Sequence, residues 1–366
     1  MWFLTLSALW RSRRAGPRKP VRSRLEVEVL ENRRVPANFT AATVPELIAA
    51  IDAANLTPEA DTLSLAAGTT FTLTRFNNLT DGANGLPVTA SGEDLTVLGN
   101  GATIERKTSR NGFHFRLFDV AVGATLTLQD LTMRGGSAFG PDGDAQGGAV
   151  RNGGTLNLDG VTLEKCEAVG MRSTLDRLSD PSASGGGIYS DGTLTVVNSR
   201  IESNAAVAGK GADARRIVSA ITGEVFYDFP TRGGDARGGG IYVAGGSATI
   251  LNTTIAGNIV AGGDGGDGLG DIFGAPGGTG HGGGMYCNGG TVTLLGVTVT
   301  ANQAKGGAGG NGSKGHSGAN GTGVGGGIFI APEAAVGIDA FTVSHTKKNY
   351  ASTADDNGSG SYDLIG

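Results

Sequence analysis

The stretch Gly185-Gly186-Gly187-Ile188-Tyr189 recurs along this chain and decides its fold. It returns at 238–242, as Gly-Gly-Gly-Met-Tyr at 282–286 and as Gly-Gly-Gly-Ile-Phe at 325–329, with a shorter version ending at Val150. Four of these stretches lead through a glycine-containing turn into alternating segments at 155–158, 194–197, 248–251 and 292–295. Alternation with a period of two is typical of strands that have one buried face. Each stretch therefore opens one copy of a repeated β unit.

A second motif closes each unit at a nearly constant distance. An aliphatic residue is followed three positions later by Asn204, Asn258 or Asn302, and by Cys166 in the first unit. This position lies 16, 16, 17 and 17 residues after the apolar residue of the first motif, whereas the segment that follows varies widely. A stack of coils requires this pattern, because coils must match one another while one corner can extrude loops. The sequence predicts an all-β fold, a right-handed parallel β-helix.

The two motifs predict two ladders that run along the stack. We expect the apolar residues of the first motif to form an aliphatic ladder inside the coils, namely Val150, Ile188, Ile241, Met285 and Ile328. We expect the three asparagines of the second motif to lie at a left-handed corner, where their amides bond backbone groups of neighbouring coils. These asparagines are therefore interpreted as structural residues.

Glycine dominates the composition, with 66 of 366 residues, and the net charge is -5. Residues 1–24 hold seven basic residues and no acid, so residues 25–366 carry 22 basic and 34 acidic groups, or -12. Because an acidic body repels phosphate, we expect no nucleic-acid partner and interpret the basic segment as a targeting leader. A disordered basic tail is the alternative on composition alone.

The remaining composition excludes two further classes of protein. The apolar run Met1–Trp10 is shorter than the ~20 residues of a membrane-spanning helix, so we expect no transmembrane span. The two cysteines, Cys166 and Cys287, fall three coils apart in the alignment of the repeats. At about 4.8 Å per coil they lie too far apart for a disulfide, which needs Cα atoms within ~7 Å.

Four regions follow from these patterns. Residues 1–37 are the basic leader, which we expect to be disordered, and residues 38–60 form an N-terminal cap. The cap contains a helix at 43–55, since Thr43 and Glu46 match a capping box and Leu47, Ile48, Ile51 and Ala54 share one face. Residues 61–346 form the β-helix with its glycine-rich loops, and residues 347–366 form a C-terminal tail.

The paired motifs resemble the repeats of chlamydial polymorphic outer membrane proteins, which carry Gly-Gly-Ala-aliphatic and Phe-x-x-Asn motifs on a pectin-lyase-like β-helix. The match covers residues 147–343, with an aliphatic residue in place of the Phe and no β-barrel translocator after the last coil. Residues 24–37, RLEVEVLENRRVPA, are similar to the leader of many exported planctomycete proteins. This resemblance implies export to the cell surface, the outer membrane or the medium.

Two long loops, 261–280 and 304–324, have few apolar residues, and we expect them to be flexible surface ribbons. Within the first, Gly262–Gly270 matches the nonapeptide of calcium-binding β-rolls once, which leaves open whether Asp264 and Asp267 bind calcium. A single copy lacks the stacked neighbours that supply six or more oxygens. We therefore assign no metal-binding or cofactor-binding residue.

The sequence holds one partial match to the motifs of β-helix enzymes. Gly280-His281-Gly282 resembles a polygalacturonase motif, but the Asn-Thr-Asp and paired-Asp segments of that family are missing upstream. The expected outward column of Thr162, Arg200, Thr254 and Thr298 supplies one Arg and no acid, and no carboxylate pair is visible on adjacent coils. We assign no catalytic residue and expect that the protein is not an enzyme.

The sequence therefore favours a non-catalytic, exported protein with a structural or adhesive role at the cell surface or in the extracellular matrix. The expected partners are a surface polysaccharide or another cell-surface protein, bound through the loops. A polysaccharide-binding or polysaccharide-cleaving β-helix is the alternative, and aromatic or acidic residues clustered on one outer ladder would favour it. The ligand and the oligomeric state stay open.

Overall fold

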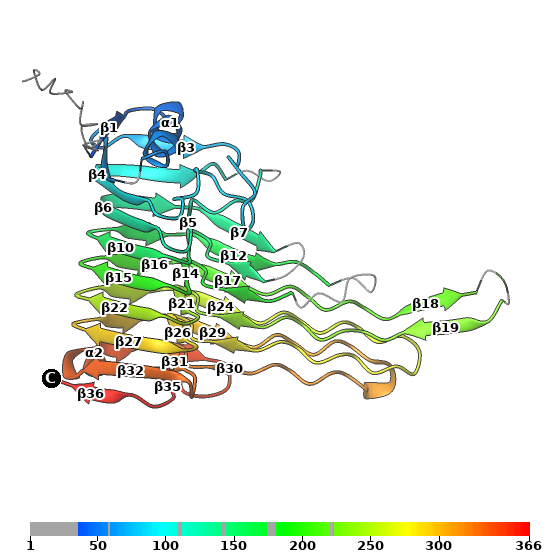
Figure 1. The fold of residues 1–366 in the computed structure, drawn as a ribbon. Helices are drawn as coiled ribbons and strands as arrows, with labels where there is room; N and C mark the ends of the chain where they lie inside the picture. The colour runs from blue at the N-terminus through cyan, green and yellow to red at the C-terminus, as the bar shows by residue number, and fades with distance from the viewer. Residues whose placement is uncertain are drawn as a thin grey trace, which may run out of the picture. The chain divides into compact units, whose positions relative to one another are not determined.

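Parallel strands organise the computed structural model of this chain, which describes residues 36–57, 59–108, 112–140, 144–173, 181–219, 221 and 223–366. The predicted leader lies outside the described residues except for its last two positions. Residues 36–366 form one compact unit with parallel sheets of 16, seven, six and five strands and one two-stranded antiparallel sheet (Figure 1). The all-β prediction is confirmed, and the long parallel sheets are consistent with a β-helix.

One repeat unit places five short strands in succession. These are β9 (Val150–Asn152), β10 (Thr155–Asp159), β11 (Thr162–Glu164), β12 (Glu167–Gly170) and β13 (Ala183–Ser184). Each strand pairs in register with its equivalent one unit further on, so that Leu156 lies beside Leu194 and Leu163 beside Ile201. A complete turn of the chain therefore adds one strand to every ladder.

The next three units repeat this order. The second contains β14 (Ile188–Ser190), β15 (Thr193–Val197), β16 (Arg200–Glu202), β17 (Ala205–Val207) and β20 (Ala236–Arg237). The third contains β21 (Ile241–Val243), β22 (Ser247–Leu251), β23 (Thr254–Ala256), β24 (Ile259–Ala261) and β25 (Gly280–His281). The fourth contains β26 (Met285–Cys287), β27 (Gly290–Leu295), β28 (Thr298–Thr300), β29 (Gln303–Lys305) and β30 (Gly323–Val324).

Less regular coils precede these units. They contain β1 (Asn38–Ala41), β2 (Ala60–Leu65), β3 (Thr70–Leu73), β4 (Asp94–Arg106), β5 (Phe118–Val120), β6 (Thr125–Arg134), β7 (Ser137–Gly140) and β8 (Ala145–Gln146). The register between β4 and β6 shifts between Leu98 and Ala102, where the chain bends from one stretch of the sheet into the next. Two strands of a regular coil are thus merged into one long strand here.

The helix α1 (Val44–Ala54) begins with the predicted capping box. Thr43 Oγ1 accepts a hydrogen bond from the Glu46 backbone N–H, and the Glu46 carboxylate accepts one from the Thr43 N–H at 3.2 Å. The helix buries Leu47, Ala50, Ile51 and Ala54 and contacts β1, β2 and β3. No helix in the described part of the chain is long and apolar enough to span a membrane.

The chain continues to pair beyond the fourth unit. It forms β31 (Ile328–Ile330), β32 (Ala334–Asp339), α2 (Ala340–His345), β33 (Thr346–Lys347), β34 (Tyr350–Ala351), β35 (Gly358–Ser359) and β36 (Asp363–Ile365). The strands β34, β35 and β36 pair with β29, β31 and β32, so the residues assigned to a tail at 347–366 extend the ladders. Asn349 takes the corner position there, as the buried asparagines do in earlier units.

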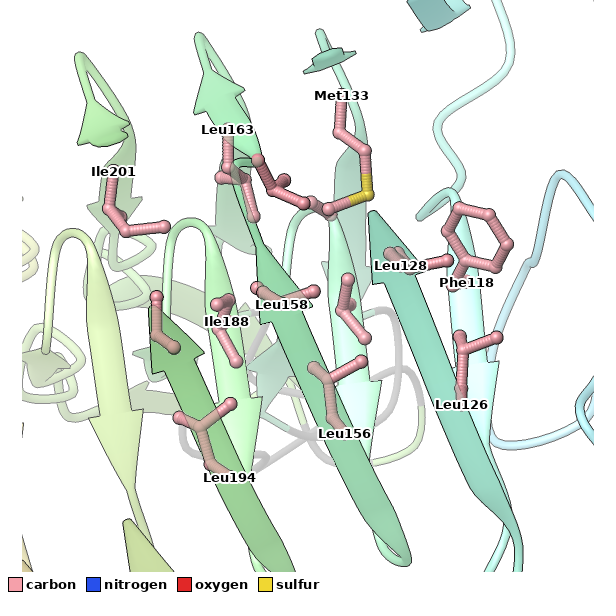
Figure 2. Close-up of a cluster of buried hydrophobic side chains, with 14 of the residues drawn as sticks. Phe118, Leu126, Leu128, Met133, Leu156, Leu158, Leu163, Ile188, Leu194 and Ile201 are labelled. Carbon is pink, nitrogen blue, oxygen red and sulfur yellow. The ribbon is translucent and has the colours of Figure 1, made fainter. Parts of the chain in front are cut away.

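The predicted aliphatic ladder is confirmed. Val150, Ile188, Ile241, Met285 and Ile328 pair in register along one sheet and are at most 3% exposed. Figure 2 shows the same arrangement on the neighbouring strands, where Met133, Leu163 and Ile201 form a row that faces the interior. Burial of such a side chain contributes about 1.5–3 kcal/mol, so repetition of one apolar position stabilises the whole stack.

The predicted asparagine ladder is also confirmed, but the left-handed residue is the one before each asparagine, namely Ser203, Gly257 or Ala301. The Asn258 Oδ1 accepts hydrogen bonds from the Asn204 backbone N–H at 2.9 Å and the Asn204 Nδ2 at 3.0 Å. In the same way, the Asn302 Oδ1 accepts hydrogen bonds from the Asn258 backbone N–H and Nδ2, and the Asn349 Oδ1 accepts them from Asn302. Cys166 ends the column, because its N–H donates to Asn204 Oδ1 and no side-chain amide follows.

A candidate binding surface on the glycine-rich arm

The loops that join β17 to β20, β24 to β25 and β29 to β30 run together away from the coils (Figure 1). We call these segments, residues 208–235, 262–279 and 306–322, the arm. The sequence predicts flexible ribbons at 261–280 and 304–324, and that prediction is wrong. The segments are joined by a regular network of backbone hydrogen bonds, which apolar content alone does not reveal.

Hydrogen bonds between successive outgoing segments recur at every third residue. Gly262, Gly265 and Gly268 donate their N–H groups to the carbonyls of Lys305, Ala308 and Asn311, at 2.9, 2.8 and 2.7 Å. The returning segments do the same, from Gly274, Gly277 and Gly280 to His316, Ala319 and Thr322. A period of three is that of the polyproline II helix, whereas a β-strand repeats every two residues.

A second set of bonds crosses between outgoing and returning segments. Gly234 donates to the Gly209 carbonyl, Gly263 to Gly234, Gly278 to Gly263 and Gly307 to Gly278, at 2.8–3.1 Å, and a last bond runs from Gly321 to Gly307. The bonds therefore pass through six segments in succession. Polyproline II helices lack internal hydrogen bonds, so partners on several sides satisfy the backbone of this arm.

Close backbone approach explains why two of every three arm positions are so often glycine. A Cβ atom at Gly266 would lie 1.7 Å from the Ala212 carbonyl oxygen, and one at Gly278 would lie 1.7 Å from the Gly234 carbonyl oxygen. Collagen has the same requirement at the crowded axis of its triple helix. The glycine pairs thus allow the segments to pack without an apolar core.

The third position of each triplet often carries an aspartate that bonds the next layer. The Asp264 Oδ1 accepts the Ala308 N–H at 2.8 Å, and the Asp267 Oδ1 accepts the Asn311 N–H at 2.7 Å. Lys210 Nζ donates to Asp267 Oδ2 at 2.9 Å and, with the Asn311 backbone, lowers the pKa of the Asp267 carboxyl. Asp264 and Asp267, the two residues considered as calcium ligands, therefore join neighbouring segments of the arm by hydrogen bonds. No group of three or more His, Cys, Asp or Glu side chains that could hold a metal occurs among the described residues.

A third aspartate, Asp235, also bonds the next layer of the chain. The Asp235 Oδ1 accepts hydrogen bonds from the Thr279 N–H at 2.7 Å and the Thr279 hydroxyl at 2.9 Å. Arg232 and Arg237 also contact this carboxylate, at 2.7 and 3.2 Å. Burial alone raises the pKa of Asp235, but the bonds from Thr279 and the two arginines lower it below its ordinary value.

At the root of the arm, His281 packs against an outward column of aromatic rings. Tyr189, Tyr242, Tyr286 and Phe329 stack in register, with ring centroids 5.3, 5.3 and 4.9 Å apart. The His281 ring lies 4.6 Å from Phe329, and its burial lowers the pKa of the imidazole. Asp235 is the only carboxylate that raises this pKa, and it already has the partners described above. His281 therefore packs like a core side chain, without a free acid beside it.

The outward column and the two cysteines singled out in the sequence lie on and inside the coils, respectively. Thr162, Arg200, Thr254 and Thr298 lie in register as the expected outward column, and Arg200 pairs with Glu202 at 2.8 Å. Cys166 and Cys287 are free and buried, and burial raises the pKa of each thiol to about 12. Neither the column nor the thiols form a reactive site.

The tip of the arm, which sequence reasoning missed, is apolar and exposed. It comprises the hairpin of β18 (Arg215–Val218) and β19 (Val225–Asp228) with the adjacent residues 229 and 269–273. Nine exposed large apolar side chains gather here, out of 21 in the described part of the chain: Ile217, Val218, Ile221, Val225, Phe226, Tyr227, Phe229, Leu269 and Phe273. A signal was present, because Ile217–Phe229 is the one apolar-rich run in the glycine-rich loops.

A groove runs beside this hairpin. It has a volume of about 460 Å³ and is lined by Phe229, Pro230, Arg232, Asp271, Ile272 and Phe273, among others. Phe273 stacks on His316 with ring centroids 4.2 Å apart, which holds one wall of the groove in place. Exposed apolar patches of this kind mark protein or membrane contact sites and ligand-binding grooves.

Scans of this chain against protein-family models, curated proteins and solved structures found no match.

Proposed function

We propose that this chain is a non-catalytic, exported protein with a structural or adhesive role at the cell surface or in the extracellular matrix. The parallel coils would form a right-handed β-helix of the pectin-lyase-like type, as the resemblance to the chlamydial repeats implies. The basic leader would direct export. In this proposal the coils support the arm, and the arm carries the contact surface.

The observation that carries the proposal is an apolar tip on a hydrogen-bonded arm. Phe229 and Phe273 are 73% and 61% exposed, although soluble proteins rarely leave clusters of such side chains in water. The backbone network restrains the segments that lead to the tip, so less conformational entropy is lost when a partner binds. A pre-organised apolar surface is what an adhesive protein requires.

A solid-phase assay tests the adhesive role. The full chain and a variant with residues 215–228 replaced by Gly-Gly would be applied to an immobilised uronic-acid polymer, a neutral β-glucan, chitin, a mucin and denatured collagen. We expect retention on at least one surface and at least tenfold weaker retention of the shortened variant, with the same melting temperature. Failure of the full chain to bind any surface, or equal retention of both proteins, contradicts the proposal.

A polysaccharide-binding or polysaccharide-cleaving protein is the second candidate, and the outward aromatic column favours it. Aromatic rings on one outer ladder offer stacking faces for sugar rings. Against it, Tyr242 and Tyr286 are only 8% and 7% exposed and already stack on their neighbours. Incubation with uronic-acid polymers, with and without calcium, separates the candidates, since reproducible depolymerisation would overturn the non-catalytic role.

A further inference from the structure

The hairpin at the tip presents apolar side chains on both of its faces. Its register places Ile217 opposite Phe226 and Val218 opposite Val225. Residues directly opposite on an antiparallel ladder share a face, and the next pair points to the other face. An ordinary surface hairpin buries one face and solvates the other, but here all four of these side chains are exposed.

The two edges of the hairpin are also open. Within the described ranges, β18 and β19 pair only with each other, so no described strand lies beside the outward N–H and C=O groups of either. A two-stranded hairpin is marginally stable in water, and an unpaired edge is a template for another strand. A strand added at this edge would complete the backbone hydrogen bonds and cover apolar surface at the same time.

The charges of the hairpin indicate which edge is used. Arg215 pairs with Asp228 at 3.0 Å across the base of the hairpin. Arg216, on β18, lies opposite Tyr227 and has no ion-pair partner among the described residues. A carboxylate on a neighbouring strand would complement this guanidinium, because opposite charges on adjacent strands attract.

A lipid surface fits these observations less well than a protein. Arg215, Arg216, Glu224 and Asp228 sum to zero charge, whereas attraction to anionic lipid headgroups requires clusters of basic residues. Hydrocarbon also offers no partner to the open backbone groups of the edge. A protein strand supplies both the hydrogen bonds and the apolar contacts.

We propose that the hairpin recognises a protein partner that adds an extended apolar strand, carrying one carboxylate, to the free edge of β18 beside Arg216. This inference rests on the adhesive function proposed above and names the partner class of the same tip. The main chain of the added strand provides affinity, and its alternating side chains contact Ile217 on one face and Val218 on the other.

A phage-displayed library of random heptapeptides, selected on the immobilised full chain, tests the proposal. We expect selected sequences to alternate apolar residues with others and to contain one Asp or Glu. In fluorescence anisotropy, N-methylation of alternate peptide bonds should weaken binding at least tenfold, since it removes the backbone donors. Arg216→Glu should weaken binding similarly, and a peptide with Lys in place of the acid should restore it. Arg200→Glu on the coils is the matched control and should leave binding unchanged.

Other outcomes overturn the proposal. The first is a selection that yields no alternating sequence with an acidic residue. The second is binding that is unchanged by Arg216→Glu and by N-methylation of the peptide. The third is cosedimentation of the chain with phosphatidylcholine vesicles that Phe226→Ser abolishes. The last outcome would show that the tip binds a lipid bilayer and not a protein strand. If the chain shortened at 215–228 loses retention on polymer surfaces while no strand peptide is selected, the adhesive function stands and only this inference fails.

Discussion

Asp267 accepts a hydrogen bond from the Asn311 backbone N–H, 44 positions later in the chain, at 2.7 Å. The bond joins two segments of the arm that meet only because the coils below them lie in register. It also explains why an aspartate stands at this position. The short carboxylate reaches an N–H group that no backbone carbonyl in the described arm accepts.

This bond predicts that the arm opens in acid. The bonds from Lys210 and the Asn311 backbone lower the pKa of Asp267, so its contribution to stability is complete above the unfolded value of about 3.9 and is lost as pH falls through the lower folded value. The protection factors of arm amides, corrected for the intrinsic pH dependence of exchange, should therefore fall below about pH 4. Asp267→Asn should show faster exchange at pH 7 and a smaller acid transition. An arm equally protected at pH 2.5 and pH 7 contradicts this mechanism.

The close packing of the arm predicts that Gly266→Ala disrupts it locally. The added Cβ would lie 1.7 Å from the Ala212 carbonyl oxygen, so the segments must separate. We expect proteolytic cleavage within the arm to accelerate at least tenfold, while the melting temperature of the coils changes little. Ala319→Ser, at an exposed third position of a triplet, is the control and should leave cleavage unchanged.

The aliphatic ladder predicts a larger effect within the coils. Ile241 is 0% exposed and pairs with Ile188 and Met285, so Ile241→Asp would bury a carboxylate without a partner. Such burial costs at least several kcal/mol, and cooperative unfolding near room temperature is expected by circular dichroism. Thr254→Asp, on the outward face of the same coil, should melt within a few degrees of the unaltered protein. A normal melting curve for Ile241→Asp would refute the ladder.

The asparagine ladder predicts that Asn258→Ala is destabilising. Loss of the amide leaves the Asn204 N–H and one of the two Asn204 Nδ2 hydrogens without an acceptor, and a buried donor without a partner costs about 1–3 kcal/mol. We expect a lower midpoint of denaturant unfolding with an unchanged slope. Asn157→Ala removes an amide at a partly exposed position and should have a much smaller effect.

Most of the fold could be predicted because its signals are local and repeated. The spacing from Ile188 to Asn204, met again in the following units, predicts strands, their register and both ladders. The end of the stack could not be placed in the same way. Asn349 occupies its ladder position without a preceding Ile-x-x-Asn motif, because the strands near it pair through the backbone and need little side-chain pattern.

The candidate site was harder to predict than the fold. Asp267 matches a calcium-binding pattern in which Asp264 also lies, but each carboxylate accepts an N–H from the next layer. Whether a Gly-Gly-x run forms a loose ribbon or a bonded lattice depends on whether other such runs lie beside it. The run itself contains no information on its neighbours.

The sequence by itself determined the coils, since alternation and constant spacing recur within each unit and act through local strand geometry and burial. Only the tertiary structure decided the arm. The equivalent segments of successive units are 40 or more residues apart, and they meet because the coils carry their ends into register. Backbone hydrogen bonds at every third residue then join the segments. These bonds form only between segments that are close in space, and their only signal in the sequence is the high glycine content.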